Sequence, residues 1–177
     1  MSIVNLFQNK YKKPAYRLYQ RLVEQARSPW FYETLKIEDS IKGRFELILI
    51  HAFLVLHRLK KLKKLGQNVF DLLFYDFDRS IRELGVGDLS VGKKIKSFAE
   101  LFYARIEYYE KGLIDLEFLE QSLVSFFEKA ARDSLKLEDL ALYMTRQVEH
   151  LAKISDTDLI EGEIVFEDLS KDFSKVA

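Results

Sequence analysis

The chain has 177 residues, the length of one domain with a real hydrophobic core. It contains no cysteine, which excludes a disulfide framework and a thiol nucleophile, and its seven glycines and two prolines are few for a β-sandwich or barrel. Its formal charge is zero, so it is no gross polycation and we expect no DNA partner.

The neutral total hides an uneven distribution of charge. Residues 1–64 carry 14 basic and 5 acidic side chains, a net of +9, so the remaining 113 residues carry −9. The basic excess is greatest at Arg58, Lys60, Lys61, Lys63 and Lys64. These charges are either solvated faces that attract one another or a basic surface for ribosomal RNA or anionic lipid.

The first half of the chain predicts three helices. Pro14 suits the first turn of a helix over 14–27, and Pro29 interrupts it before a short aromatic segment. A third helix is predicted over 41–64, and its stretch over 45–56 is apolar on all sides except at Glu46 and His51. Its apolar run is shorter than the roughly 20 residues of a membrane span. We therefore expect a central core helix with a basic extension over 58–64, ended at a break near Gly66.

A helical pair follows. Apolar residues at 70, 73, 74, 77, 81 and 84, and then at 91, 95, 98, 102, 106 and 109, have the spacing of amphipathic helices over 69–84 and 91–111. Gly85 can take the left-handed conformation that ends the first helix, and Ser90 can cap the second. Further helices are predicted over 116–132, capped by Asp115, and over 137–153.

The predicted fold is all-α. We expect a single compact multi-helix domain of six to eight helices around one central apolar helix. The helical domain spans 14–154, after an N-terminal extension over 1–13 and before an acidic C-terminal segment over 155–177.

No motif predicts catalysis. Gly87–Lys93 matches the start of a phosphate-binding loop, but Lys94 stands where Ser or Thr is needed and the preceding segment is helical. Asp76 and Asp78 point in different directions on a helix. His51 fits a hydrogen-bonded core histidine better than a metal ligand. We expect no enzyme, metal or cofactor; a nucleotide-linked enzyme acting through Gly87–Lys93 is the weakest alternative.

The chain is rich in aromatic residues, with 14 Phe, 9 Tyr and 1 Trp. They either line a groove for an apolar partner helix or cover the edge of the core with their hydroxyls in water. Composition alone leaves both possibilities open.

Three ordered blocks resemble the ubiquinol–cytochrome c chaperone family, the assembly factors for cytochrome b of the respiratory bc1 complex. The first block is Ala26-Arg27 through Phe31-Tyr32, followed by Gly43-Arg44-Phe45-Glu46-Leu47, His51 and Arg58-Leu59. The second is Phe70-Asp71, Phe74, Asp76-Phe77-Asp78 and Arg82-Glu83. The third is Gly85-Val86-Gly87-Asp88-Leu89 with Val91-Gly92-Lys93, then Ala99-Glu100, Phe102-Tyr103 and Arg105. Ala104 and the proline-free loop 36–40 depart from the family pattern.

The resemblance implies an all-α, non-enzymatic chaperone that holds newly made cytochrome b. Mitochondrial members of the family act near the ribosomal tunnel exit with a small partner subunit. For this chain, contact with that subunit, with the ribosome or with the membrane surface is an expectation that the resemblance leaves open. Because the start of the chain is unlike a mitochondrial leader, we expect a bacterial member, cytoplasmic or peripheral at the inner membrane, or on the matrix side if eukaryotic. The alternative function is a membrane- or ribosome-surface adaptor acting through the basic face.

On this interpretation two sets of residues matter. The expected groove for the client protein is apolar and consists of Phe45, Leu49, Phe53, Phe70, Phe74, Phe77, Phe98 and Phe102. The charges expected to fix the packing around it are Arg44, Asp71, Asp78, Arg82, Glu83, Asp88 and Lys93.

Overall fold

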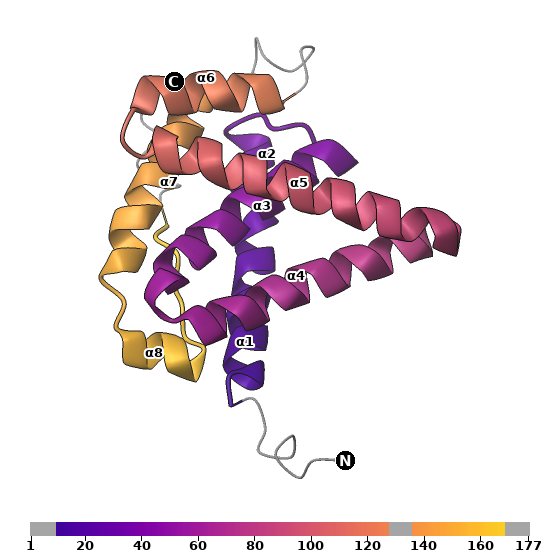
Figure 1. Ribbon diagram of the computed structural model, residues 1–177. Coiled ribbons are helices and arrows are strands. Elements are labelled where there is room, and N and C mark those ends of the chain that lie inside the picture. The colour runs from indigo at the N-terminus through magenta and orange to yellow at the C-terminus, as the bar shows by residue number, and fades with distance from the viewer. Residues whose placement is uncertain (1–9, 128–135, 169–177) are drawn as a thin grey trace.

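The computed structural model describes residues 10–127 and 136–168, and within these ranges every regular element is a helix (Figure 1). The all-α prediction is thus confirmed. The described elements are α1 (Lys12–Ala26), α2 (Pro29–Glu33), α3 (Ile41–Arg58), the 3-10 helix η2 (Leu59–Lys61), α4 (Lys63–Glu83), α5 (Asp88–Gly112), α6 (Leu116–Phe126), α7 (Leu137–Ala152) and α8 (Asp156–Glu161).

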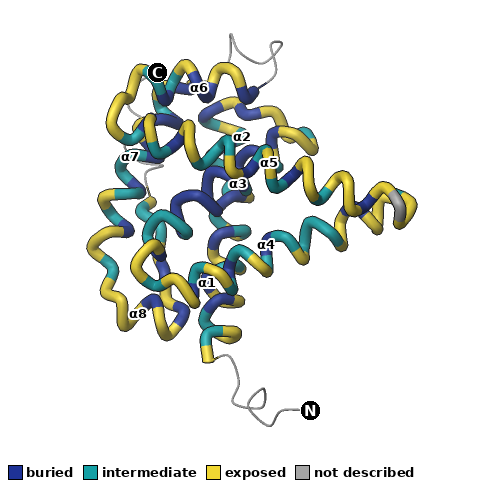
Figure 2. The backbone as a smooth tube through the Cα atoms, in the orientation of Figure 1, coloured by how far each residue is buried: buried dark blue, intermediate teal, exposed yellow. Residues whose placement is uncertain are grey.

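Helix α3 is the centre of the fold, as its composition predicts. It packs against α1, α4, α5 and α7, and Figure 2 shows it as the most continuously buried element. Its side chains from Leu49 to Val55 are all buried, including His51. A helix can bury its whole circumference only where neighbours cover every face, so the other helices are arranged around this one.

The predicted helix over 41–64 is wrong at its C-terminal end. Helix α3 stops at Arg58, η2 makes one tight turn, and α4 begins at Lys63. The chain turns here because Leu59 and Leu65, on either side of the bend, are both buried in the same core. Gly66 is therefore no break: it lies inside α4, where its backbone approaches the side chain of Leu59.

Helices α4 and α5 form a long hairpin that projects from the body (Figure 1). Gly85 closes the tip with φ of 77°, the left-handed conformation that its sequence position predicts. The predicted cap at Ser90 is wrong, because α5 begins at Asp88 and Gly87 precedes it. Leu84 was expected to face inward, but it follows the last turn of α4, beyond the body, and is 73% exposed.

The C-terminal half closes the other side of the core. The predicted cap Asp115 accepts a hydrogen bond from the backbone N–H of Phe118. Helix α6 ends at Phe126, because the backbone of Phe127 is extended, so the helix predicted over 116–132 is too long; residues 128–132 lie outside the described ranges. After α8, residues 163–168 run along α7. The side-chain amide of Gln147 holds Glu167 there, donating to its carbonyl at 2.8 Å and accepting from its N–H at 3.0 Å.

His51 is the hydrogen-bonded core histidine that its sequence position predicts. Its Nδ1 lies 2.7 Å from the carbonyl of Leu47 and its Nε2 lies 2.9 Å from the hydroxyl of Tyr143. A carbonyl only accepts, so Nδ1 carries the proton and Nε2 accepts from the tyrosine. Gln25 in turn donates to the oxygen of Tyr143 at 3.2 Å. The imidazole is neutral, because burial lowers its pKa to about 4.

A buried ion pair joins the central helix to the hairpin. The guanidinium of Arg105 on α5 donates to both carboxylate oxygens of Glu46 on α3, at 2.8 and 3.0 Å. The side chain of Glu46 is only 3% exposed and that of Arg105 only 13%. The same guanidinium lies 3.4 Å from the centre of the Phe126 ring, so α6 joins the contact. One side chain therefore fixes three helices.

The protonation of His51 predicts a pH dependence of stability. The pKa of His51 is about 4 in the folded chain and near 6.5 in the unfolded chain. The stability that comes from burying the neutral imidazole is therefore fully present above pH 6.5 and is lost as the pH falls toward 4. Between pH 7 and 5, the wild type should lose about 2 kcal/mol more unfolding free energy than a His51→Gln variant. Urea unfolding at both pH values measures this difference, and equal losses would contradict it.

The Glu46–Arg105 pair predicts a strong effect of a single substitution. Arg105→Met leaves a buried carboxylate without its partner and should reduce the unfolding free energy by about 3 kcal/mol. The double variant Glu46→Leu with Arg105→Met should recover part of this loss, because no unpaired charge remains. Exposed Arg82 is the control: Arg82→Ala should hardly move the urea midpoint. Arg105→Met behaving like Arg82→Ala would show that the pair is dispensable.

Candidate functional site

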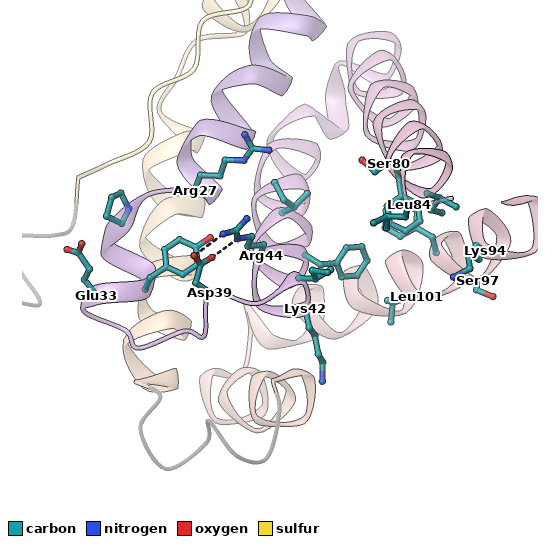
Figure 3. A pocket seen from close by; sticks show the side chains of 18 residues that line it. Arg27, Glu33, Asp39, Lys42, Arg44, Ser80, Leu84, Lys94, Ser97 and Leu101 are labelled. Carbon is teal, nitrogen blue, oxygen red and sulfur yellow. Dashed lines mark hydrogen bonds and ion pairs between the residues drawn. The ribbon is translucent and has the colours of Figure 1, made fainter. Parts of the chain in front are cut away.

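A groove of about 1270 Å³ lies between the hairpin and the body (Figure 3). One wall is formed by the end of α1, by α2 and by the start of α3. The other wall consists of the outer halves of α4 and α5. The groove exists because the hairpin extends beyond the helices that cover its base. The outer halves of α4 and α5 therefore have no neighbour on the side that faces the body.

Three phenylalanines form the aromatic part of the groove. Phe77 of α4 and Phe98 of α5 stack with ring centres 3.8 Å apart, and Phe45 of α3 lies 5.7 and 5.5 Å from them. Each comes from a different helix, so the cluster joins the hairpin to the central helix at the bottom of the opening. All three belong to the expected groove residues, and all three line it.

Two aliphatic side chains at the rims were missed by sequence reasoning. Ile41, at the first position of α3, is 82% exposed, and Leu84, at the end of α4, is 73% exposed. Both line the groove, on opposite walls. The sequence could not indicate their exposure, because an apolar residue at a helix end fits the periodicity of a buried stripe as well as that of an exposed rim. Large apolar side chains held open to water at a groove are typical of a surface for an apolar partner.

The rest of the expected groove set lies elsewhere. Leu49, Phe53 and Phe102 are at most 1% exposed, so these residues are core and not groove. Phe70 and Phe74 stack on each other with ring centres 4.3 Å apart, behind the groove, where they cover the core between α4 and α5. Periodicity identified one face of each helix, but it could not separate positions under the body from positions beyond it.

The many aromatic residues of the chain fall into two groups, one that lines the groove and one that does not. The phenylalanines supply the groove, whereas Tyr75 and Tyr103 are 67% and 59% exposed and do not line it. Tyr19, by contrast, is half-buried and donates to the carboxylate of Asp76 at 2.8 Å. Burial and this hydrogen bond raise the pKa of Tyr19, so the phenol stays neutral.

The charged residues that were expected to fix the packing around the groove lie at or near the hairpin. Arg82 donates to Asp78 at 2.7 Å and to Asp88 at 2.6 Å, which bridges the two helices at the tip. The hydrogen bond from Arg82 holds the pKa of Asp78 below its usual value. These side chains are exposed, so screening by water makes their contribution to stability small. The remaining members are also on the surface: Arg44 pairs with Asp39, Glu83 with Arg79 and Asp71 with Gln67, and Lys93 is exposed.

The basic surface is smaller than the sequence predicts. The side chain of Arg58 is only 14% exposed: it donates to the carbonyls of Leu151 and Ile154 and to the carboxylate of Asp156, which closes the C-terminal end of α7. Lys60 pairs with Glu110 at 2.8 Å. The predicted extension of 58–64 into solvent is therefore wrong for Arg58. Of the five residues of the predicted basic surface, Lys61, Lys63 and Lys64 are exposed and form no ion pair within the described part of the chain.

The alternative sites gain no support. Gly87–Lys93 is the tip of the hairpin and the first turns of α5, preceded by a helix and not by a strand, so the geometry of a phosphate-binding loop is missing. Across residues 10–127 and 136–168, no group of three His, Cys, Asp or Glu side chains could hold a metal ion. The helices in these ranges include none that is long and apolar enough to cross a membrane.

Three vertebrate proteins resemble this chain in sequence. It is 28% identical over 167 residues to "Ubiquinol-cytochrome-c reductase complex assembly factor 1" of Xenopus laevis, a match that covers 90% of this chain and 84% of that protein. The mouse and human proteins with the corresponding name are each 26% identical over 162 residues. The chain spans about half the length of these two mammalian relatives, 55% and 54%.

A solved structure and a family pattern extend the comparison. The fold superposes with a TM-score of 0.83 on the crystal structure of the Cbp3 homolog from Brucella abortus, at 31% identity, covering 99% of this chain and all of the other. The sequence pattern of the family described as "Ubiquinol-cytochrome C chaperone" matches residues 33–166, which include the groove floor, the hairpin and the Glu46–Arg105 pair. This chain therefore belongs to the ubiquinol–cytochrome c chaperone family.

Proposed function

We propose that this chain is a non-enzymatic assembly chaperone of the ubiquinol–cytochrome c reductase complex, and that its groove shields an apolar segment of newly made cytochrome b. Membership of a chaperone family and relatives named as assembly factors of this complex support the general role. The observation that carries the proposal is the groove itself, with Phe45, Phe77 and Phe98 at its floor and exposed Ile41 and Leu84 at its rims.

The shape of the groove suits such a client. A segment destined for a membrane exposes a broad apolar face, which water-filled surroundings make prone to aggregation. The groove is open to solvent, so a helix can be laid into it without being threaded. Its apolar walls come from rigid helices held by the Glu46–Arg105 pair, so little ordering is needed on binding.

The rim residues predict a direct test of the groove. Ile41→Asp and Leu84→Asp each place a carboxylate where apolar contact is expected, and each should reduce the recovery of cytochrome b in a crosslinked pull-down at least about fivefold. The matched control is Ile114→Asp: Ile114 is 92% exposed but does not line the groove.

Thermal unfolding of the three variants separates binding from folding. All three positions are exposed, so unfolding free energies should stay within about 0.5 kcal/mol of the wild type. Loss of cytochrome b with all three variants, or with none of them, would count against the groove as the binding site. Recovery of many unrelated membrane proteins at the same level would count against a dedicated client.

A second candidate is an adaptor that contacts an anionic surface through Lys61, Lys63 and Lys64. Their exposure without ion pairs in the described residues favours it. It is compatible with the chaperone role, with work in the cytoplasm of a bacterium at the inner membrane, and with partners such as the ribosomal tunnel exit or a small subunit. Each of these remains a prediction.

Salt distinguishes the two candidates. Co-sedimentation with anionic vesicles, and separately with ribosomes, should fall steeply between about 50 and 200 mM salt if these lysines contact phosphates. Replacing the three lysines with Glu should abolish it, whereas capture of cytochrome b by the groove should persist. Unchanged co-sedimentation of the triple variant would remove the adaptor from consideration.

A further inference from the structure

The charges around the groove are unbalanced. Four basic and two acidic side chains line it, a formal net of +2: Arg27, Lys42, Arg44 and Lys94 against Glu33 and Asp39. Arg44 already holds Asp39 in a two-pronged ion pair at the mouth, drawn as dashed lines in Figure 3. The charge that a bound molecule meets beyond this pair is therefore mainly positive.

Two of these cations lie on facing walls. Lys94 is the one charged side chain in the hairpin wall, among Phe77, Ser80, Ile81, Leu84, Ser97, Phe98 and Leu101. Arg27 stands across from it, at the end of α1 (Figure 3). Neither forms an ion pair within residues 10–127 and 136–168. Both are consequently available to a carboxylate that enters with an apolar segment.

We propose that the groove takes an apolar helix bearing acidic residues beside its apolar stretch, and that it rejects the same helix flanked by lysine or arginine. This inference rests on the proposed use of the groove for a client. An acidic flank gains an opposite charge from Lys94 and Arg27, whereas a basic flank meets like charges next to surfaces of low polarity. The apolar floor thus provides affinity and the rim provides choice.

The choice matters for a membrane protein. Cytoplasmic loops of such proteins carry an excess of Lys and Arg next to their helices. A cationic rim disfavours helix ends of that kind and leaves them to the membrane surface. It favours the segments, or the opposite ends of segments, that carry Asp or Glu. The groove therefore holds a subset of a client's apolar segments and not all of them.

Paired peptides test the inference. Two fluorescein-labelled peptides of about 18 residues, roughly five helical turns, share one Leu/Phe face and differ only in two flanking residues, both Glu or both Lys. Fluorescence polarisation should show the acidic peptide binding the wild type about three- to tenfold more tightly at low salt. Lys94→Glu should reverse the preference. Lys93→Glu, the same charge change on an exposed neighbour that does not line the groove, should leave it unchanged.

Each other result would overturn the inference. Equal binding of both peptides would leave an apolar groove without charge selection, so the client proposal would survive and this one would not. A preference for the basic peptide would refute it directly. The same effect from Lys93→Glu and Lys94→Glu would assign the preference to the general field of the hairpin. Binding of neither peptide would remove both this inference and the groove as client site.

Discussion

The buried pair of Glu46 and Arg105 is the interaction on which the rest of this structure depends. It ties the hairpin to the central helix near the base, and Phe126 against the guanidinium brings α6 to the same point. Nearby, Tyr109 is fully buried, which raises the pKa of its phenol well above the usual value and keeps it neutral beside the ion pair. The hairpin is also held by stacked phenylalanines and by α1, which packs along α4 and donates a hydrogen bond from Tyr19 to Asp76, whereas its tip extends into solvent.

Firm attachment at the base, with a tip that extends beyond the body, explains why the molecule can have both a stable core and an open groove. If α4 and α5 were covered along their whole length, Leu84 and Lys94 would be buried or paired and no opening would remain. Placing a desolvated ion pair at the base gives a rigid support, since each charge is costly without the other.

Much of this fold could be predicted from the sequence, and the reason is the strength of the helical periodicity. The run over Leu47–Leu56, apolar except for His51, identified the central helix, and Gly85 identified the hairpin corner. His51 was expected in the core because its neighbours along the chain are apolar. The bend after Arg58 was missed, since a run of lysines continues a helix as well as it ends one. Its cause is a tertiary demand, the burial of Leu59 and Leu65 on both sides of the turn.

The groove could be predicted only in part, for a related reason. Periodicity assigns a residue to a face of its own helix, but it does not say how far along that helix the neighbouring elements reach. Phe77 and Phe98 share a helix face with Phe70 and Phe102, and only the point at which the body ends makes the first two groove and the others core. The predicted exposure of the basic segment was wrong for a different reason. The guanidinium of Arg58 donates hydrogen bonds to the backbone carbonyls at the end of α7 and is therefore largely buried.

The distribution of polar and apolar contacts bears on how such a site could release what it holds. A chaperone that passes its client on must bind it without reaching the affinity of a permanent interface. Here the apolar contact is confined to three rings and a few aliphatic side chains, while the rim offers exposed charges whose attraction is weakened by water and salt. The deeply buried ion pair, which could have provided strong binding, is instead used within the protein to hold the walls. Specificity at the rim and rigidity at the base thus allow selection among segments with moderate affinity for each.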